Sequence, residues 1–357
     1  MLEPWGPLQM FFTDLHYQHQ KKYNATLVAQ AYEMLHDPYC RLYYCFLDSV
    51  LQKFTQFNLL FQSECVVITS LHGQACELYK DILLMYMNRD YVMKRSLADV
   101  DPGEEREFLM LEQVYLGASV LKRTVENVAM YNDRARMKEF RLKCRSFLVT
   151  AAKQVKKRYD FGDPVLSRLS MLDPAYVVGH QGVREQSLVP LASCLPRIIE
   201  QDDLTLQKQD DEWRRLGMDN LPEEVTSMAQ QKCMIKEKFP DKFWGTVKTV
   251  VDDKGIPKYE CVAHFALAVL SLPHSNADCE RCFSDINRMK SKDRNTLKTD
   301  TIRDVLLAKQ CVHWKQNNCT TFTPSRAMLR NMNSKVLYPS TAIAGEEPQD
   351  VPDIYID

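Results

Sequence analysis

Glycine is scarce in this chain. It supplies 11 of the 357 residues, about 3%, against about 7% in ordinary proteins. Few glycines, together with long stretches free of both glycine and proline, disfavour tight-turned β-structure and favour helices. A sustained alternation of apolar and polar residues, which would indicate strands, is also lacking. The sequence therefore predicts a mostly α protein.

Long apolar runs are missing as well. No segment approaches the roughly 20 apolar residues that span a bilayer. The N-terminus, MLEPWGPLQMFF, lacks the basic start and long apolar centre of a signal peptide. The 12 cysteines are scattered without a short-range framework. These features favour an intracellular, reducing compartment with free thiols, and they give no reason to expect a membrane partner.

The chain also lacks an excess of charge of one sign. The formal net charge is −1, so any affinity for nucleic acid has to come from a local patch. The clearest patch is a predicted helix from about Asp133 to Arg158, with ten Lys or Arg and the single acid Glu139 between Arg134 and Arg158. One side of this helix carries an apolar stripe of Met137, Phe140, Cys144, Phe147, Ala151 and Val155.

The basic side of this helix has two interpretations. It could contact a DNA backbone, because each phosphate contact releases counterions. The slightly favoured alternative is a solvated face that the acidic stretch 200–224 neutralises. A shorter basic segment, 288–298, poses the same choice. The candidate DNA-backbone residues are Arg134, Arg136, Lys138, Arg141, Lys143, Lys290, Lys292 and Arg294.

Asp-Pro dipeptides mark expected helix starts, because Asp suits the N-cap and Pro suits the first helical position. They occur at residues 37–38, 101–102, 163–164 and 173–174. From about residue 160 to 220 the helical pattern weakens, with several prolines and an acidic run at 209–212. We expect a loosely structured connector there, with a short helix at 188–195.

The C-terminal third contains three expected helices. Residues 259–272 are apolar almost all round, which is typical of a helix buried on all sides. After Pro273, a helix starts at Ser275, whose spacing from Asp278 suits a capping box. A last helix starts near 299–300, and a polar tail, expected to be disordered, follows from about 320. The side chains expected to face inward are Cys279, Cys282, Phe283, Ile286 and Met289 on one helix and Ile302, Val305, Leu306 and Leu307 on the other.

Residues 270–297 read LSLPHSNADCERCFSDINRMKSKDRNTL. This run resembles the C-terminal dimerisation region of hAT-family transposases. Cys279 to Ser284 matches the family's Glu-Arg-x-Phe-Ser core, and the basic segment ending at Leu297 matches its Arg-x-x-Leu step. The resemblance covers about 240–312, and the helical sequence upstream is similar in character to the family's inserted all-α domain.

The resemblance implies an RNase H-like core interrupted by a helical insertion, of which this chain would hold the C-terminal helices. The expected segments are a helical insertion-like region at 1–215, including the loose connector from about 160, a dimerisation region at 216–315, and a flexible, acidic-ended tail at 316–357. The residues expected at the dimer interface or in the core are Phe265, Leu267, Leu270, Phe283, Ile286 and Leu306.

Catalysis in this family is expected to need three carboxylates, because two divalent metals must be clamped for attack on a phosphodiester. Glu280 occupies the position of the third carboxylate. The two partner Asp lie upstream of the insertion in the family, and Asp14, Asp48 and Asp81 match no family motif. One carboxylate cannot hold such metals. The expectation is therefore no enzyme and no cofactor, with Mg²⁺ or Mn²⁺ required only if a complete triad exists elsewhere.

The sequence offers one further metal candidate. Cys279 and Cys282 form a Cys-x-x-Cys pair that could join Cys311 and His313 around zinc. Zinc pairs usually lie on turns, whereas this pair lies on a predicted helix and adds to its apolar face. Buried free cysteines are the favoured interpretation, and no metal site is predicted.

The expected function is non-catalytic. The chain would form a homodimer, or a heterodimer with a related hAT protein, by burying the apolar faces of 259–312, with non-specific affinity for duplex DNA as an additional property. The resemblance implies a nuclear location. Two alternatives stay open: a fragment of an active hAT transposase whose two catalytic Asp lie outside this chain, and a DNA-binding module.

Overall fold

The structure, a computed structural model, is helical throughout the part of the chain that it describes. Within that part, extended pairing is limited to two isolated bridges, Met87 with Phe108 and Val251 with Pro257. The prediction of a mostly α protein is confirmed, and the RNase H-like core stays a prediction. The described residues are 4–18, 24–62, 65–127, 130, 133–179, 186–230, 239–291, 294–314, 318 and 320–332.

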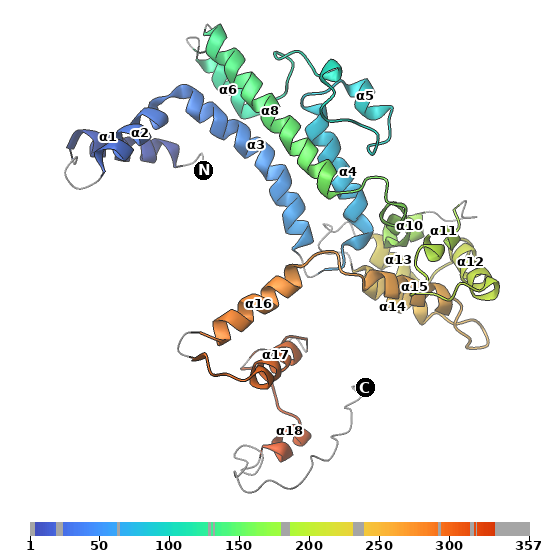
Figure 1. Cartoon of the computed structure of the whole chain (residues 1–357). Coiled ribbons are helices and arrows are strands. Elements are labelled where there is room, and N and C mark those ends of the chain that lie inside the picture. Colours follow the sequence, from blue (N-terminus) through green and yellow to red (C-terminus); the bar gives the residue numbers. More distant parts are fainter. Residues whose placement is uncertain are drawn as a thin grey trace. The chain divides into compact units, whose positions relative to one another are not determined.

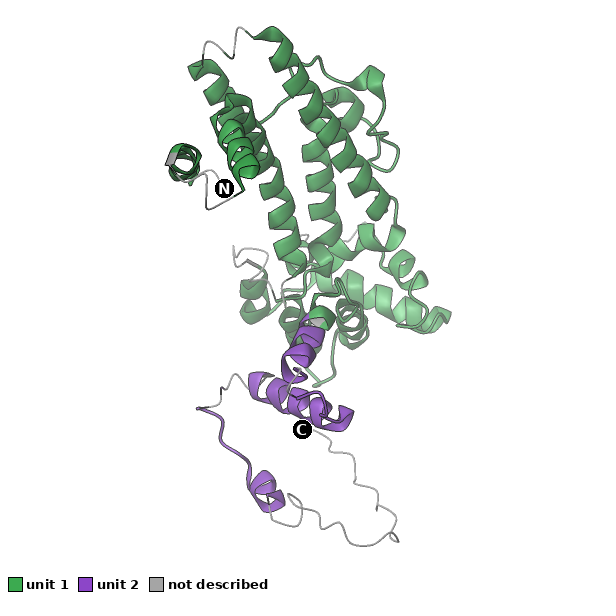
Figure 2. Ribbon diagram, turned by 60° about the vertical axis from the view of Figure 1, so that its left-hand side comes forward, with its two compact units in different colours: residues 1–280 green, residues 281–357 purple. Residues whose placement is uncertain are grey.

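The chain divides into two compact units, residues 1–280 and 281–357 (Figure 2). The predicted segment borders at 215/216 and 315/316 rest on family resemblance, whereas the two units are defined by their compactness. The predicted borders therefore stay predictions. None of the helices in the described ranges is long and apolar enough to cross a membrane.

The first core of unit 1 lies among three long helices. These are α3 (Pro38–Phe61), α4 (Ile68–Leu84) and α8 (Arg134–Arg158), which run side by side (Figure 1). Shorter elements pack on them in part: α2 (Ala25–His36) and α6 (Ala118–Glu126) contact α3, and α5 (Arg89–Met93) contacts α4. Helix α1 (Trp5–Gln18) packs on α2, and a 3₁₀ turn lies at Glu105–Glu107.

The long basic helix is confirmed as α8, with Asp133 as its N-cap. Its buried stripe differs from the expected one in the C-terminal half, where Leu148 and Ala152 are buried in place of Phe147 and Ala151. Residues four apart are offset by about 40° around a helix. A buried stripe of four-residue steps therefore winds gradually around the helix instead of staying on one side. Phe147 lies at the edge of the contact, where its ring meets that of Phe46 edge-on at 5.6 Å.

Three of the four Asp-Pro helix starts are confirmed, at α3, α9 (Pro164–Arg168) and α10 (Pro174–Gly179). The fourth, Asp101-Pro102, is wrong. There the Asp101 carboxylate accepts the backbone N–H of Gly103 at 2.8 Å and closes a local turn instead of capping a helix.

The second core of unit 1 lies where a loose connector was expected, and that expectation is wrong. The segment holds α9, a 3₁₀ turn at Leu169–Leu172, α10, α11 (Val189–Ser193) and α12 (Asp203–Met218). Helix α12 buries Trp213 and Leu216 although its sequence is acidic. In the sequence, the acidic residues of α12 suggest a loosely structured segment. In the structure, part of their charge is hydrogen-bonded inside the protein. Helices α13 (Glu223–Gln230), α14 (Pro240–Lys248) and α15 (Glu260–Leu270) complete this core.

Helix α16 (Ala277–Met289) spans the border between the units, and α17 (Thr299–Trp314) and α18 (Arg326–Asn331) follow in unit 2. Helix α16 starts two residues later than expected, after Ser275 Oγ has accepted the N–H of Ala277 at 3.3 Å. The side chain of Asp278 lies outside the described residues, so the capping box stays a prediction. The tail expected to be disordered contains α18, and residues 333–357 lie outside the described part of the chain.

Candidate functional site

The apolar helix predicted at 259–272 is α15, and a buried carboxylate of α12 caps it. Glu212, only 6% exposed, accepts the backbone N–H of Val262 at 2.9 Å in the first turn of α15. Burial raises the pKa of Glu212, and hydrogen bonds from the N–H groups of Val262 and Cys261 oppose that rise without cancelling it. Glu212 thus satisfies donors that a helix N-terminus otherwise leaves unpaired.

A second carboxylate holds the residues that lead into α15. Asp219, directly after α12, accepts the Tyr259 hydroxyl at 2.6 Å and the Lys258 ammonium at 3.2 Å. The hydrogen bond from Tyr259 keeps the pKa of Asp219 below its ordinary value, and Lys258 contributes in the same direction against burial. The start of α15 is therefore fixed to both the middle and the end of α12.

A further carboxylate, Asp210 of α12, is bonded to α12 itself and to the residues that precede α11. It accepts the Ser187 hydroxyl at 2.5 Å, the Leu188 N–H at 3.2 Å and the Arg214 Nε at 2.8 Å. Burial opposes its ionisation, but the hydrogen bonds from Arg214 and Ser187 outweigh burial and lower its pKa. These three carboxylates bond to the residues before α11, to Arg214 of α12 and to the start of α15. The other acids of 200–224 leave neutralisation of α8 by this stretch a prediction.

The sequence reasoning missed this role of the acidic run. Its signal was present in the spacing: Gln209, Glu212, Trp213 and Leu216 share one side of a helix. Carboxylates that accompany Trp on a buried stripe are candidates for capping a neighbouring helix.

Three of the six residues predicted for the core or interface belong to the interior of unit 1. Phe265 and Leu270 are 2% and 5% exposed, and Leu267 is half-buried against the second core. They pack in the cluster that includes α12 and α14. The apolar surface of Phe265 and Leu270 is already covered within one chain.

The other three residues lie in unit 2 and are more exposed. Phe283 on α16 is 63% exposed, and Ile286 and Leu306 are half-buried. On α17, Ile302 is buried as predicted, but Val305 and Leu307 are 48% and 56% exposed, so their expected inward orientation is wrong. Val305 and Leu307 lie two residues apart on a helix and therefore face different sides, so one neighbouring helix cannot cover both.

An ion pair joins α16 to α17. Lys309 Nζ lies 2.6 Å from Asp285 Oδ2, and Arg288 lies 4.0 Å from the other carboxylate oxygen. The hydrogen bond from Lys309 lowers the pKa of Asp285. This contact pairs the polar sides of the two helices while Phe283 stays exposed.

Glu280 lies exposed on α16, and no carboxylate pair accompanies it in the described residues. Within those residues, no group of three or more His, Cys, Asp or Glu side chains could hold a metal ion. Asp14, Asp48 and Asp81 lie on α1, α3 and α4, and Asp81 forms an ion pair with Lys53. The geometry gives Glu280 no described metal-binding partner.

The Cys-x-x-Cys pair is not buried as expected. Cys279 and Cys282 are both exposed free thiols on α16, and Cys311 on α17 is half-buried. The expectation of burial failed because it assumed a covered apolar face on α16, and that face is open around Phe283.

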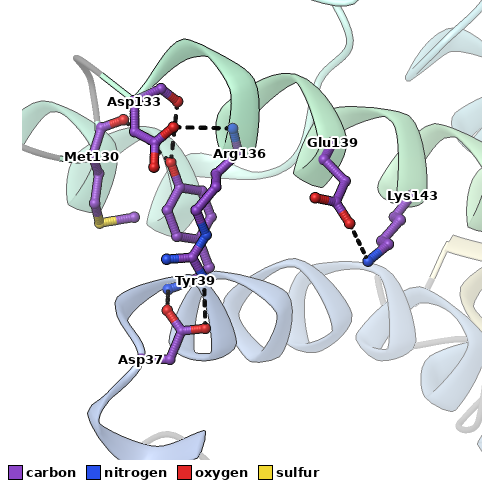
Figure 3. Close-up of polar contacts among 7 residues, drawn as sticks. All are labelled: Asp37, Tyr39, Met130, Asp133, Arg136, Glu139 and Lys143. Atoms are coloured by element: carbon purple, nitrogen blue, oxygen red, sulfur yellow. Dashed lines mark hydrogen bonds and ion pairs between the residues drawn. The ribbon is translucent and has the colours of Figure 1, made fainter.

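Several cations of the basic helix are engaged within the chain (Figure 3). Arg136 Nη2 lies 2.9 Å from Asp37, and its guanidinium covers the Tyr39 ring at 4.4 Å. Lys143 pairs with Glu139 at 2.7 Å, and Arg141 donates to the Leu111 carbonyl at 2.8 Å.

The remaining DNA-backbone candidates are less constrained. Arg134 and Lys138 on α8 are exposed, as are Lys290 and Arg294 near the end of α16, while Lys292 lies outside the described residues. The structure thus leaves a smaller set of free cations than the charge count of the helix indicated.

Comparison with known proteins identifies one segment. Residues 251–312 match the family model described as the hAT family C-terminal dimerisation region. No curated protein and no solved structure matches the chain. The matched segment holds α15 in unit 1, α16 across the border between the units, and most of α17 in unit 2. Residues 251–312 of this chain are therefore a hAT-family C-terminal dimerisation region.

Proposed function

We propose that this protein acts by dimerisation, and that a second copy of the chain, or a related hAT protein, covers the apolar side chains of α16 and α17. The observation that carries the proposal is the exposure of Phe283, 63%, inside a segment that matches a dimerisation region. A contiguous exposed apolar patch is typical of a surface that a partner buries, and we infer that Phe283 belongs to such a patch.

The helices of this segment differ in how far their apolar side chains are buried, and this difference supports the same proposal. Helix α15 is committed to the core of unit 1, with Phe265 2% exposed. Helices α16 and α17 present Phe283, Val305 and Leu307 to solvent. We infer that α15 anchors the segment and that α16 and α17 supply the contact. In a symmetric dimer each such side chain would be buried twice, once in each protomer.

The test is sedimentation equilibrium of the full chain and its Phe283→Asp variant. A buried carboxylate without a partner is strongly disfavoured, so the variant should dimerise at least about tenfold more weakly. The matched control is Leu204→Asp, which alters an exposed side chain (84%) on α12 in unit 1 and should leave the dimerisation constant unchanged.

A wild-type chain that sediments as a monomer at micromolar concentration contradicts this proposal. Equal weakening by Phe283→Asp and Leu204→Asp also contradicts it, because general acidity rather than a local contact would then be responsible.

We further propose that the chain is catalytically incomplete and has no resident cofactor. The support is chemical: the family's reaction requires three carboxylates around metal ions, and Glu280 is the one residue of this chain matched to that set. The nuclear location and a weak affinity for duplex DNA are proposals that rest on the family resemblance and on exposed cations such as Lys138.

A further inference from the structure

A concave pocket of about 330 Å³ lies in unit 1, far along the sequence from the dimerisation region. Its walls come from the first turns of α3 and from the last turn of α6 and the residues after it. Two of the side chains that line it, Arg41 and Arg123, are cationic. The lining residues are Pro38, Arg41, Leu42, Arg123, Glu126, Asn127 and Met130.

The guanidinium of Arg41 is poorly satisfied. Its Nε is shielded from solvent and has no hydrogen-bond partner in the described residues. Its Cζ lies 5.8 Å from the centroid of the Trp5 ring, whose buried indole N–H likewise has no hydrogen-bond partner among the residues that the structure describes. An aromatic face attracts a cation but neutralises no charge.

Arg123 is held on the same pocket by a weak acceptor. Its Nε donates to the sulfur of Cys45 at 3.2 Å, and a thiol accepts hydrogen bonds poorly. No ion pair joins Arg41 or Arg123 to a carboxylate within the described ranges. The one carboxylate of the lining, Glu126, is exposed and lies 3.8 Å from Lys122.

The two arginines repel each other across this space. Burial lowers the pKa of Arg41, and the positive charge of Arg123 lowers it further. A guanidinium nevertheless stays protonated in proteins, so the pair keeps both charges. Two half-buried cations that form no ion pair with a carboxylate of the described residues are an arrangement that a bound anion would complete.

We propose that the pocket between α3 and α6 binds a phosphate group through Arg41 and Arg123. Arginine forks match the oxygens of phosphate, and two forks need more acceptor oxygens and more negative charge than one carboxylate carries. The pocket volume is at the lower end of ligand sites, so it suits a phosphate with a small attached group. The phosphate belongs either to a small phosphorylated compound or to a nucleic-acid backbone.

The first experiment is titration calorimetry of the full chain with inorganic pyrophosphate, in chloride buffer at low ionic strength. We expect saturable binding at one site. Arg41→Gln and Arg123→Gln should each weaken it by at least about tenfold, because each removes one charged fork. Lys138→Gln, which removes an exposed cation of α8, should leave the affinity unchanged.

Thermal unfolding separates binding from a structural role of these arginines. Pyrophosphate should raise the Tm of the wild-type chain and not that of Arg41→Gln. Without pyrophosphate, Arg41→Gln should be at least as stable as the wild type, since it removes an unneutralised charge. A variant that unfolds at a lower Tm without pyrophosphate overturns the claim that Arg41 is unneutralised and serves an anion.

Short duplex DNA distinguishes the two sources of phosphate. Competition between DNA and pyrophosphate, lost in both arginine variants, supports a nucleic-acid backbone as the ligand. Pyrophosphate binding without competition supports a small phosphorylated compound. The proposal is overturned if neither binds saturably, if both variants bind as the wild type does, or if Lys138→Gln weakens binding equally.

Discussion

At the scale of single residues, Glu212 has an environment that suits a carboxylate poorly. Its carboxylate is buried, and it accepts a hydrogen bond from the backbone N–H group of Val262 rather than from a cationic side chain. Such a group stabilises the fold as a hydrogen-bond acceptor and destabilises it as a buried charge. A substitution that keeps the hydrogen-bond acceptor and removes the charge distinguishes these two contributions.

Replacing Glu212 therefore has two expected results. Glu212→Ala leaves the N–H groups of Val262 and Cys261 without an acceptor and should lower the free energy of unfolding by about 1–3 kcal/mol. Glu212→Gln keeps an acceptor oxygen and should cost less. Urea unfolding measures both, and equal losses in the two variants would show that hydrogen bonding is not what Glu212 contributes.

The pH dependence follows from the raised pKa of Glu212. The unfolded chain ionises this carboxyl at a lower pH than the folded chain does, so its contribution is fully present below the unfolded pKa and is lost as pH rises through the folded pKa. Relative to wild type, Glu212→Gln should gain stability as pH rises across this window. Unfolding curves at several pH values measure the difference, and a difference that does not change with pH would contradict the assignment.

At the scale of single elements, the start of α6 depends on one glycine. Gly117 precedes the helix with φ +101° and ψ +149°, a conformation that is essentially confined to glycine. A Cβ at this position would also lie 2.7 Å from the Ser49 hydroxyl of α3. The close approach of α6 to α3, which brings Arg123 to its pocket, thus requires a residue without a side chain.

Gly117→Ala should lower the free energy of unfolding by about 1–3 kcal/mol or more, because strain and a steric clash act together. Gly245→Ala in α14 is the control, since a Cβ there meets nothing within 4 Å. That helix-interior change should instead stabilise by about 0.5–1 kcal/mol. Chemical denaturation gives both values, and a neutral Gly117→Ala would mean that the loop relaxes freely.

At the scale of the whole molecule, folding and association are expected to be separable. Unit 1 has its own two hydrophobic cores, and the residues proposed for association lie on α16 and α17. A protomer that cannot dimerise should therefore remain folded, unlike the protomers of many obligate dimers.

The stability of the wild-type chain should consequently rise with its concentration. Binding to the native state adds about 2.7 kcal/mol when the partner is at 100 times its Kd. We expect the Tm of wild type to increase with protein concentration and the Tm of Phe283→Asp to stay constant, as followed by circular dichroism. A wild-type Tm that is independent of concentration would contradict dimerisation.

Much of this molecule follows from the sequence by itself. Low glycine content and apolar periodicity predict the helical class, and the basic helix, the apolar helix α15 and helices α16 and α17 form where the pattern places them. The Glu-Arg-x-Phe-Ser run identifies the dimerisation region, which the family match confirms. These properties are local, since helix periodicity, capping and a contiguous motif depend on residues that are near one another in the chain.

Only the tertiary structure decided which side chains are covered. Phe265 and Phe283 are the same residue type on apolar stripes of neighbouring helices, yet one is 2% and the other 63% exposed. The burial of the acidic residues Asp210 and Glu212 of α12, and of Asp219 after it, depends on donors that folding brings from distant segments. The pocket likewise brings together Arg41 and Arg123, which lie on separate helices. Burial and neutralisation depend on partners brought together by folding, which periodicity along the chain does not specify.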